Sequence, residues 1–126
     1  MPIRKILLVD DDAGFHFLQR MVLKEANIDC QIDSVYDGHE ALKYMEECKG
    51  SPDLILLDLN MPNWDGLDFL EECRKCGRLP DYVRIFILTS SLLPEDKVRA
   101  TAYNFVTGYL EKPLTPQSLQ SILAHF

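Results

Sequence analysis

Apolar stretches alternate with segments of helical periodicity along the whole chain. The stretches are residues 4–9, 30–35, 54–58, 83–88 and 106–110. Short apolar runs bounded by turn residues are typical of β-strands, and apolar residues spaced three and four apart are typical of amphipathic helices. Strands that are joined through helices run parallel, with right-handed crossovers. The pattern therefore predicts an α/β fold.

Each helical segment carries an apolar face that we expect to pack on the sheet. The residues expected to point inward are Phe15, Leu18, Val22 and Ala26 in the first helix; Ala41, Met45 and Cys48 in the second; Leu67, Leu70 and Cys73 in the third; Val98 and Ala102 in the fourth; and Leu119, Ile122, Leu123 and Phe126 in the last. Gly77 is expected to end the third helix, while Pro94 and Thr115-Pro116 begin the last two. The face of the fourth helix is the weakest, which suits an element that is held loosely.

The stretches at 4–9, 54–58 and 83–88 are nearly continuous apolar runs, as expected of a sheet that is covered on both faces. We therefore expect a three-layer, doubly wound sheet of five parallel strands with five helices. A chain of 126 residues fits one such domain, over residues 1–126, and shows no repeat or linker. In this kind of fold, ligands bind beyond the carboxyl ends of the strands.

The composition is that of a globular protein with an acidic surface. The net charge is −7, with 47% hydrophobic and 26% charged residues. Such a chain is not expected to bind nucleic acid by charge attraction, but it suits a bound cation or a cationic partner. No apolar run approaches the ~20 residues that a membrane span needs, and the apolar run near the start is too short for a secretory signal peptide. We expect a cytoplasmic protein that binds neither nucleic acid nor membrane.

Four cysteines raise the question of a metal or redox site. Cys73 and Cys76 form a C-x-x-C pair, whereas Cys30 and Cys48 are isolated. A structural zinc needs four ligands. The pair also lies late in an expected helix, not after a strand as thioredoxin-like chemistry requires. We therefore interpret the cysteines as reduced packing residues.

Polar residues follow four of the five expected strands. Asp10, Asp11 and Asp12 follow the first strand, Asp58 and then Asn60 the third, Thr89 and Ser90 the fourth, and Lys112 the fifth. Because the carboxyl ends of parallel strands meet at one edge of the sheet, these residues converge on one rim. Neighbouring carboxylates repel one another, and a divalent cation relieves that repulsion. An all-oxygen site of this kind suits Mg²⁺.

The same rim fits phosphoryl chemistry. Asp58 stands alone at its centre, and a carboxylate can act as a nucleophile that forms an aspartyl phosphate. Lys112 can hold a phosphoryl oxygen as a point charge, and Thr89 can hold one as a hydrogen-bond donor. Asn60 lies in the turn beyond Asp58, where its backbone carbonyl can join the metal ligands.

Several nearby residues have ordinary structural interpretations. An acid of the first run, such as Asp12, can cap the helix that follows, because acids favour helix N-termini. We interpret His16 and His39 as surface histidines and Trp64 as a partly exposed packing residue. Tyr109 in the fifth strand is compatible with plain packing.

Four sequence motifs together resemble the receiver domains of two-component response regulators. The motifs are LLVDD at 7–11, DLNMPNWDG at 58–66, ILTS at 87–90 and GYLEKP at 108–113. Each motif alone is weak, but their order and their places at the strand ends make the combination specific. The resemblance spans essentially the whole chain and implies the CheY-like, flavodoxin-like strand order 2-1-3-4-5.

The resemblance implies a role for each acid on the rim. Asp58 would accept a phosphoryl group from a sensor histidine kinase or a histidine phosphotransfer protein. Asp11, Asp58 and the backbone carbonyl of Asn60 would bind Mg²⁺ or Mn²⁺ directly, and Asp10 would assist through water. The extra acid, Asp12, need not bind the metal.

The resemblance also implies a switch. Lys112 would pair with the phosphoryl group, and its peptide bond to Pro113 would be cis, an isomer that proline makes accessible. Thr89 would hydrogen-bond the phosphoryl oxygen and move inward, and the ring of Tyr109 would turn with it. The surface of the fourth helix, fifth strand and fifth helix would then bind an unidentified downstream protein. Such a protein catalyses only its own phosphorylation and dephosphorylation, and we expect a monomer or a weak dimer.

Other functions remain as alternatives. A flavodoxin-like electron carrier shares the fold, but three aspartates after the first strand would repel a flavin phosphate. A phosphatase with an aspartyl nucleophile needs a second acid two residues on, where this chain has Asn60. A phosphorylation-independent binding module would be expected to lack Asp11, Asp58 or Lys112, and all three are present. A phosphorelay intermediate is an alternative to a terminal switch.

Overall fold

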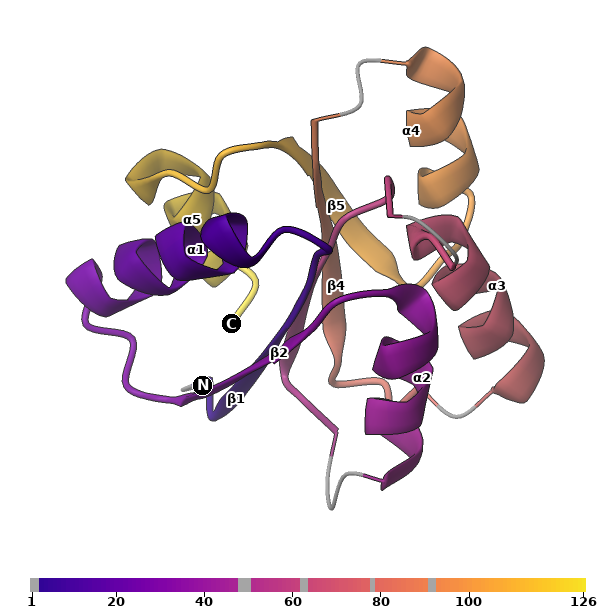
Figure 1. Cartoon of the computed structure of the whole chain (residues 1–126), viewed down its shortest axis with the longest axis horizontal. Helices are drawn as coiled ribbons and strands as arrows, with labels where there is room; N and C mark the ends of the chain where they lie inside the picture. Colours follow the sequence, from indigo (N-terminus) through magenta and orange to yellow (C-terminus); the bar gives the residue numbers. More distant parts are fainter. Residues whose placement is uncertain (1–2, 48–50, 62–63, 78, 91–92) are drawn as a thin grey trace.

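Strands and helices alternate along the chain in the computed structural model (Figure 1), which describes residues 3–47, 51–61, 64–77, 79–90 and 93–126. The strands are β1 (Lys5–Val9), β2 (Gln31–Val35), β3 (Leu54–Leu57), β4 (Arg84–Thr89) and β5 (Val106–Glu111). The helices are α1 (Ala13–Glu25), α2 (Gly38–Glu47), α3 (Gly66–Cys76), α4 (Pro94–Thr101) and α5 (Pro116–Leu123). Each element lies where the sequence pattern predicts it.

The strands form one parallel sheet in the order β2-β1-β3-β4-β5. Helices α1 and α5 lie on one side of this sheet, and α2, α3 and α4 lie on the other (Figure 1). The predicted three-layer, doubly wound α/β fold is therefore confirmed. The strand order reverses between β1 and β3, where folds of this class form their ligand sites.

The three central strands are buried on both faces. Alternate residues of each strand point to opposite sides, so Leu7, Ile55 and Ile85 join one hydrophobic cluster with α2, α3 and α4. Their neighbours Ile6 and Leu54 join a second cluster with α1 and α5. Burial on both sides explains the continuous apolar runs in the sequence. It also holds the strand ends rigidly, because packed side chains leave the backbone little freedom.

The inward faces of α2, α3 and α5 are confirmed. Residues at the predicted inward positions that are buried are Ala41, Leu70, Cys73, Leu119 and Ile122. Those that are partly buried and pack against the same clusters are Met45, Leu67, Leu123 and Phe126. Cys48 lies outside the described residues. Helix α3 ends at Gly77, whose backbone is left-handed with φ of 60°, as its predicted role as a helix stop requires.

The predicted inward faces of α1 and α4 are partly wrong. Leu18 of α1 is 53% exposed and Val98 of α4 is 67% exposed. Ala26 and Ala102 are exposed as well. The other two predicted residues of α1, Phe15 and Val22, are partly buried and pack against the core as expected. The residues buried instead are His16, Gln19 and Leu23 in α1 and Ala100 in α4. The inward stripe of α1 contains two polar residues, so a search for apolar periodicity alone selects a face rotated away from the true one.

Two aromatic predictions hold. Trp64 is half-buried, and its ring meets the exposed His39 edge-on, with ring centroids 5.6 Å apart.

No helix within the described segments has the length and apolarity needed to cross a bilayer.

The two cysteines of the C-x-x-C pair lie in different environments. Both belong to α3, but Cys73 is buried while Cys76 is exposed. Burial raises the pKa of the Cys73 thiol to about 12, and the nearby Cys76 and Glu72 add to the shift. Because the thiolate is the reactive form, we expect iodoacetamide at pH 8 to alkylate Cys76 rapidly and to leave Cys73 unmodified until urea unfolds the chain. Peptide mapping by mass spectrometry measures both sites. Equal protection of the two thiols would contradict this prediction and indicate a disulfide or a bound metal.

Candidate functional site

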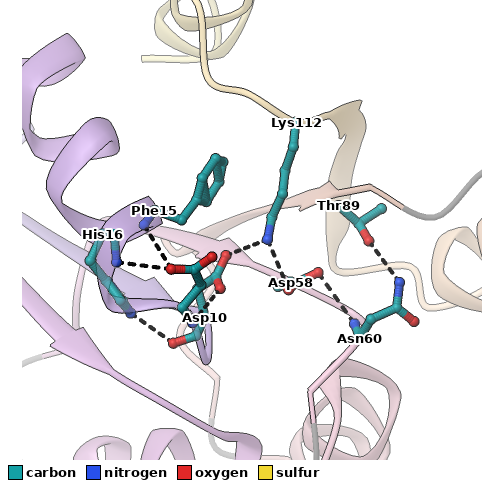
Figure 2. A network of polar contacts seen from close by, with 9 residues as sticks. Asp10, Phe15, His16, Asp58, Asn60, Thr89 and Lys112 are labelled. Carbon is teal, nitrogen blue, oxygen red and sulfur yellow. Dashed lines mark hydrogen bonds and ion pairs between the residues drawn. The ribbon is translucent and has the colours of Figure 1, made fainter.

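The predicted strand-end residues that meet at the carboxyl edge of the sheet (Figure 2) are Asp10, Asp58, Asn60, Thr89 and Lys112. Asp10 directly follows β1 and Asp58 directly follows β3, while Thr89 is the last residue of β4. The backbone fixes these positions, since the Asp58 amide donates to the Val9 carbonyl at 2.9 Å. The Lys112 amide donates to the Thr89 carbonyl, also at 2.9 Å. The convergence expected from the parallel topology is confirmed.

Three carboxylates form the centre of the rim. One oxygen from each of Asp10, Asp11 and Asp58 lies within 4.8 Å of the others. Asp10 is 1% exposed and Asp58 is 3% exposed, whereas Asp11 faces solvent. No other such group of potential metal ligands occurs among the described residues. Asp12 points elsewhere: its carboxylate caps α1 by accepting from the Gly14 and Phe15 amides, as predicted for one acid of this run.

The Lys112 ammonium lies between the two buried carboxylates. Its Nζ is 2.6 Å from Asp10 Oδ2 and 3.0 Å from Asp58 Oδ2. The same nitrogen lies over the ring of Phe15, 4.2 Å from the ring centroid. A cation–π contact therefore adds to the two ion pairs. The side chain is only 17% exposed. The Lys112–Pro113 peptide bond is cis, as the resemblance implies.

Burial and charge act in opposite directions on these groups. Burial raises the pKa of Asp58, the Lys112 charge and hydrogen bond lower it, and the neighbouring Asp10 raises it again; the net pKa is above the ordinary value of 3.8. For Lys112, burial lowers the pKa, but its hydrogen bonds and attraction to Asp10 and Asp58 outweigh that effect and raise it. One cation therefore balances two buried anions incompletely, and the rim retains an excess of negative charge.

Asn60 connects the acid cluster to β4. Its backbone amide donates to Asp58 Oδ1 at 3.2 Å. Its side-chain amide lies 3.5 Å from the hydroxyl of Thr89, which is the outer limit of a hydrogen bond. Thr89 itself is fully buried. The threonine hydroxyl is thus oriented toward the Asp58 loop through a weak contact.

The donor set fits a hard divalent cation. Carboxylates and a nearby backbone carbonyl offer only oxygen ligands, which Mg²⁺ and Mn²⁺ prefer. Both oxygens of Asp10 have protein partners, the Asp12 amide at 2.9 Å and Lys112 Nζ. Both oxygens of Asp58 also have partners, the Asn60 amide and Lys112 Nζ. The exposed Asp11 therefore has the most freedom to bind an ion.

Three features of the site were not found from the sequence. His16 was interpreted as a surface residue, but it is 3% exposed and its Nε2 lies 2.7 Å from the Asp10 carbonyl oxygen. Phe15 contacts Lys112 as well as the core. Gly66 packs directly against the Asp58 backbone. Phe15 and Lys112 are distant in sequence, whereas the other two contacts lie within short segments, and no sequence pattern signals any of the three.

Tyr109 occupies the position in β5 that pairs with Ile87 of β4. It is half-buried and packs against the cluster on the α2, α3 and α4 side. Lys97 of α4 places its Nζ 5.9 Å from the centre of the tyrosine ring. The ring therefore lies where β5 and α4 meet, on the same side of the sheet as the exposed α4 surface.

Comparison with known proteins agrees with the site. The family model described as the response regulator receiver domain matches residues 6–124. Response regulator Rcp1 of Synechocystis is 37% identical over 118 residues, which cover 88% of this chain and 78% of Rcp1. The probable C4-dicarboxylate response regulator DctR of Halalkalibacterium halodurans is 29% identical over 126 residues, which cover 99% of this chain but 52% of DctR. The chain thus spans about half the length of that relative.

Solved structures share the fold over nearly the whole chain. A two-component response regulator from Cytophaga hutchinsonii has a TM-score of 0.88 at 28% identity, covering 98% of this chain and 96% of that one. The Mn²⁺-bound form of response regulator Rcp1 has a TM-score of 0.75 at 30% identity, covering 95% and 88%. The family match, the fold and the acid cluster at the carboxyl edge lead to one assignment: the chain belongs to the response regulator receiver domain family of two-component signal transduction.

Proposed function

We propose that this chain, as a receiver domain over residues 1–126, is a phosphorylation switch in which Asp58 accepts the phosphoryl group. The donor is a sensor histidine kinase or a histidine phosphotransfer protein. The observation that carries the proposal is the position of the Lys112 ammonium, 2.6 Å from Asp10 and 3.0 Å from Asp58. A lysine held between a metal-binding acid and a nucleophilic acid supplies positive charge where a phosphoryl group arrives.

The transfer forms one bond and breaks another. A carboxylate oxygen of Asp58 attacks phosphorus, the new P–O bond forms, and the P–N bond to the donor imidazole breaks with its electron pair returning to the ring. Burial keeps the Asp58 carboxylate poorly hydrated, as its raised pKa reflects, and a poorly hydrated carboxylate is a better nucleophile. Lys112 and the hydroxyl of Thr89 hold the phosphoryl oxygens.

The same cluster of acids is the proposed metal site. Asp11, Asp58 and the backbone carbonyl of Asn60 would hold Mg²⁺ or Mn²⁺ directly, with Asp10 acting through water. A bound cation of this kind supplies positive charge that offsets the phosphoryl oxygens and the acid cluster. The incomplete balance of two buried anions by one lysine supports this assignment.

Phosphorylation then changes a surface. The Thr89 hydroxyl leaves its weak contact with Asn60 for the phosphoryl oxygen, and Tyr109 moves with it. Helix α4 is suited to respond, because Ala100 is its one residue described as buried. The altered surface of α4, β5 and α5 binds a downstream protein, which is a shift between two states biased by one local charge event.

The test is phosphorylation by a small donor. We expect acetyl phosphate with Mg²⁺ to add the mass of one phosphoryl group, and omission of Mg²⁺ to abolish the gain. The Asp58→Asn variant keeps the shape of the side chain but lacks the nucleophilic oxygen, so it should gain no mass. Intact-mass spectrometry measures all three samples.

A matched control is available at an exposed acid far from the rim. Asp81→Asn removes one carboxylate from the loop before β4 and should leave the mass gain unchanged. Absence of any gain in folded wild-type protein would reject the phosphoryl switch. The chain would then be assigned to binding modules that act without phosphorylation.

A further inference from the structure

His16 is a buried polar residue that the proposed phosphoryl chemistry does not use. It lies in the first turns of α1 and is 3% exposed. Its Nε2 lies 2.7 Å from the backbone carbonyl oxygen of Asp10 (Figure 2). A carbonyl oxygen only accepts, so Nε2 carries the proton and donates it in this bond. A buried carbonyl needs such a partner.

The carbonyl that His16 holds belongs to the peptide bond between Asp10 and Asp11. A peptide bond is planar, so fixing its oxygen fixes the plane that joins the two residues. On the other side of Asp10, its amide donates to the Val35 carbonyl at 3.2 Å. The His16 bond therefore sets the direction in which the backbone leaves Asp10 and the direction in which Asp11 points.

The imidazole is itself held in place. Its ring lies against that of Tyr36, which follows β2, with centroids 4.7 Å apart and an angle of 55° between the ring planes. Helix α1 fixes the other end of the side chain, and the Asp12 cap fixes the start of that helix. His16 thus connects α1 and the end of β2 to the loop that carries the acids.

We propose that His16 is a positioning residue for the metal site: its Nε2–H bond to the Asp10 carbonyl orients the Asp10–Asp11 peptide so that the two carboxylates face Asp58. The inference rests on the proposed metal-binding role of these acids. Groups that orient metal ligands without touching the metal affect its binding strongly, and their loss typically weakens binding by about 10-fold to 100-fold.

The test compares side chains that keep or lose the Nε2 donor. Glutamine places its amide nitrogen close to the position of Nε2, so His16→Gln retains the bond. His16→Leu removes it, and His16→Asn moves the amide nitrogen to the position of Nδ1. Isothermal titration calorimetry with MgCl₂ measures the affinity of each folded variant, and thermal unfolding without metal reports its stability.

We expect His16→Leu and His16→Asn to bind Mg²⁺ about 10-fold more weakly than the wild type. His16→Gln should bind with nearly wild-type affinity even where its melting temperature falls. His125→Leu, a change at an exposed histidine near the C-terminus, is the matched control and should bind as the wild type does. If His16→Leu fails to fold, His16→Asn decides the comparison.

The outcomes separate this inference from the proposed function. Absence of Mg²⁺ binding in wild-type protein would reject the metal site itself. If the wild-type protein binds Mg²⁺ and His16→Asn or His16→Leu binds it with the same affinity, only the proposed role of His16 is overturned. An equal loss of Mg²⁺ affinity in His16→Gln and His16→Leu would overturn it as well. The donor that glutamine keeps would then have no effect on metal binding, as expected of a purely structural histidine.

Discussion

Replacing Lys112 by methionine is expected to lower the free energy of unfolding by about 3 kcal/mol in metal-free buffer at neutral pH. Methionine keeps most of the aliphatic length of the side chain but removes the charge, and with it the cation–π contact with Phe15. Asp10 and Asp58 are then left buried side by side without a counter-charge. Breaking a buried ion pair typically costs 3–5 kcal/mol, and we expect the lower end because Lys112 is 17% exposed.

The loss of stability in Lys112→Met should become smaller as the pH is lowered. In the wild type, burial already raises the pKa of Asp58 above 3.8 while Lys112 lowers it, so the variant raises it further. An acid whose pKa is higher in the folded state than in the unfolded state destabilises the fold while it is ionised. That penalty fades as the pH falls through the raised folded pKa toward 3.8. The difference between variant and wild type is therefore largest at neutral pH and narrows as the pH is lowered.

Urea unfolding at pH 7 and pH 5, with and without MgCl₂, measures these effects. Mg²⁺ should stabilise the variant more than the wild type, because the ion supplies the charge that the lysine no longer provides. Lys75→Met is the matched control, since Lys75 is exposed and pairs with Glu72 at 3.7 Å. Exposed pairs contribute at most about 1 kcal/mol. The prediction would be contradicted if Lys112→Met and Lys75→Met changed the free energy of unfolding equally. It would also be contradicted if the loss of stability in Lys112→Met grew as the pH was lowered.

The residues of the rim were predictable because topology places them. Parallel strands present their carboxyl ends at one edge, so Asp10, Asp58, Thr89 and Lys112 had to meet once the alternation of strands and helices was recognised. The position of each acid relative to its strand was enough, and no side-chain detail was needed. Burial of β1 and β3 on both faces then follows from their apolar runs.

The inward face of α1 could not be obtained in the same way. Apolar spacing selected Leu18, but the helix instead buries His16 and Gln19. Burying a histidine is favourable only when its ring nitrogen has a hydrogen-bond partner. Here the partner of Nε2 is the Asp10 carbonyl at 2.7 Å. That carbonyl carries no sequence signal, because every residue has one. Tertiary contact thus overrides the helical pattern.

The buried face of helix α4 was also not predictable from its apolar pattern. The sequence correctly indicated that its apolar face is weak, but it assigned Val98 to the interior, where Ala100 lies instead. A helix of low apolar content fits the sheet in more than one rotation, and the close approach to β5 favours the small residue. The exposed Val98 and Leu93 then lie on the surface that we propose to change on phosphorylation.

Gly66 ends the sequence motif at 58–66, but the motif does not indicate how closely this residue packs. It is the first residue of α3, and its amide donates to the Leu59 carbonyl at 3.2 Å. A Cβ atom at this position would lie 2.4 Å from the Asp58 carbonyl oxygen and 3.0 Å from the Leu59 Cα. Both obstacles are backbone atoms, which cannot rotate away as a side chain can.

Gly66→Ala is therefore expected to displace the loop that carries Asp58. Overpacking of this kind costs about 1–3 kcal/mol of stability. The effect on chemistry should be larger, because a misplacement of about 1 Å in a reacting group can slow a reaction on the order of 10²-fold. We expect phosphorylation by acetyl phosphate to slow by that order at a temperature where the variant is folded, and time-resolved intact-mass measurement reports the rate.

Gly14→Ala provides the contrast, because it makes the same substitution in the first turn of α1 on the same rim. There the nearest atom to an added Cβ is an oxygen of the Asp12 side chain, 3.3 Å away, and the position is exposed. Alanine favours a helix over glycine by up to about 1 kcal/mol, so this variant should be as stable as the wild type or more stable. Its phosphorylation rate should not change. A Gly66→Ala variant that matched Gly14→Ala in both stability and rate would show that the backbone of Asp58 does not require close packing against α3, and that the nucleophile is positioned by β3 and Lys112 alone.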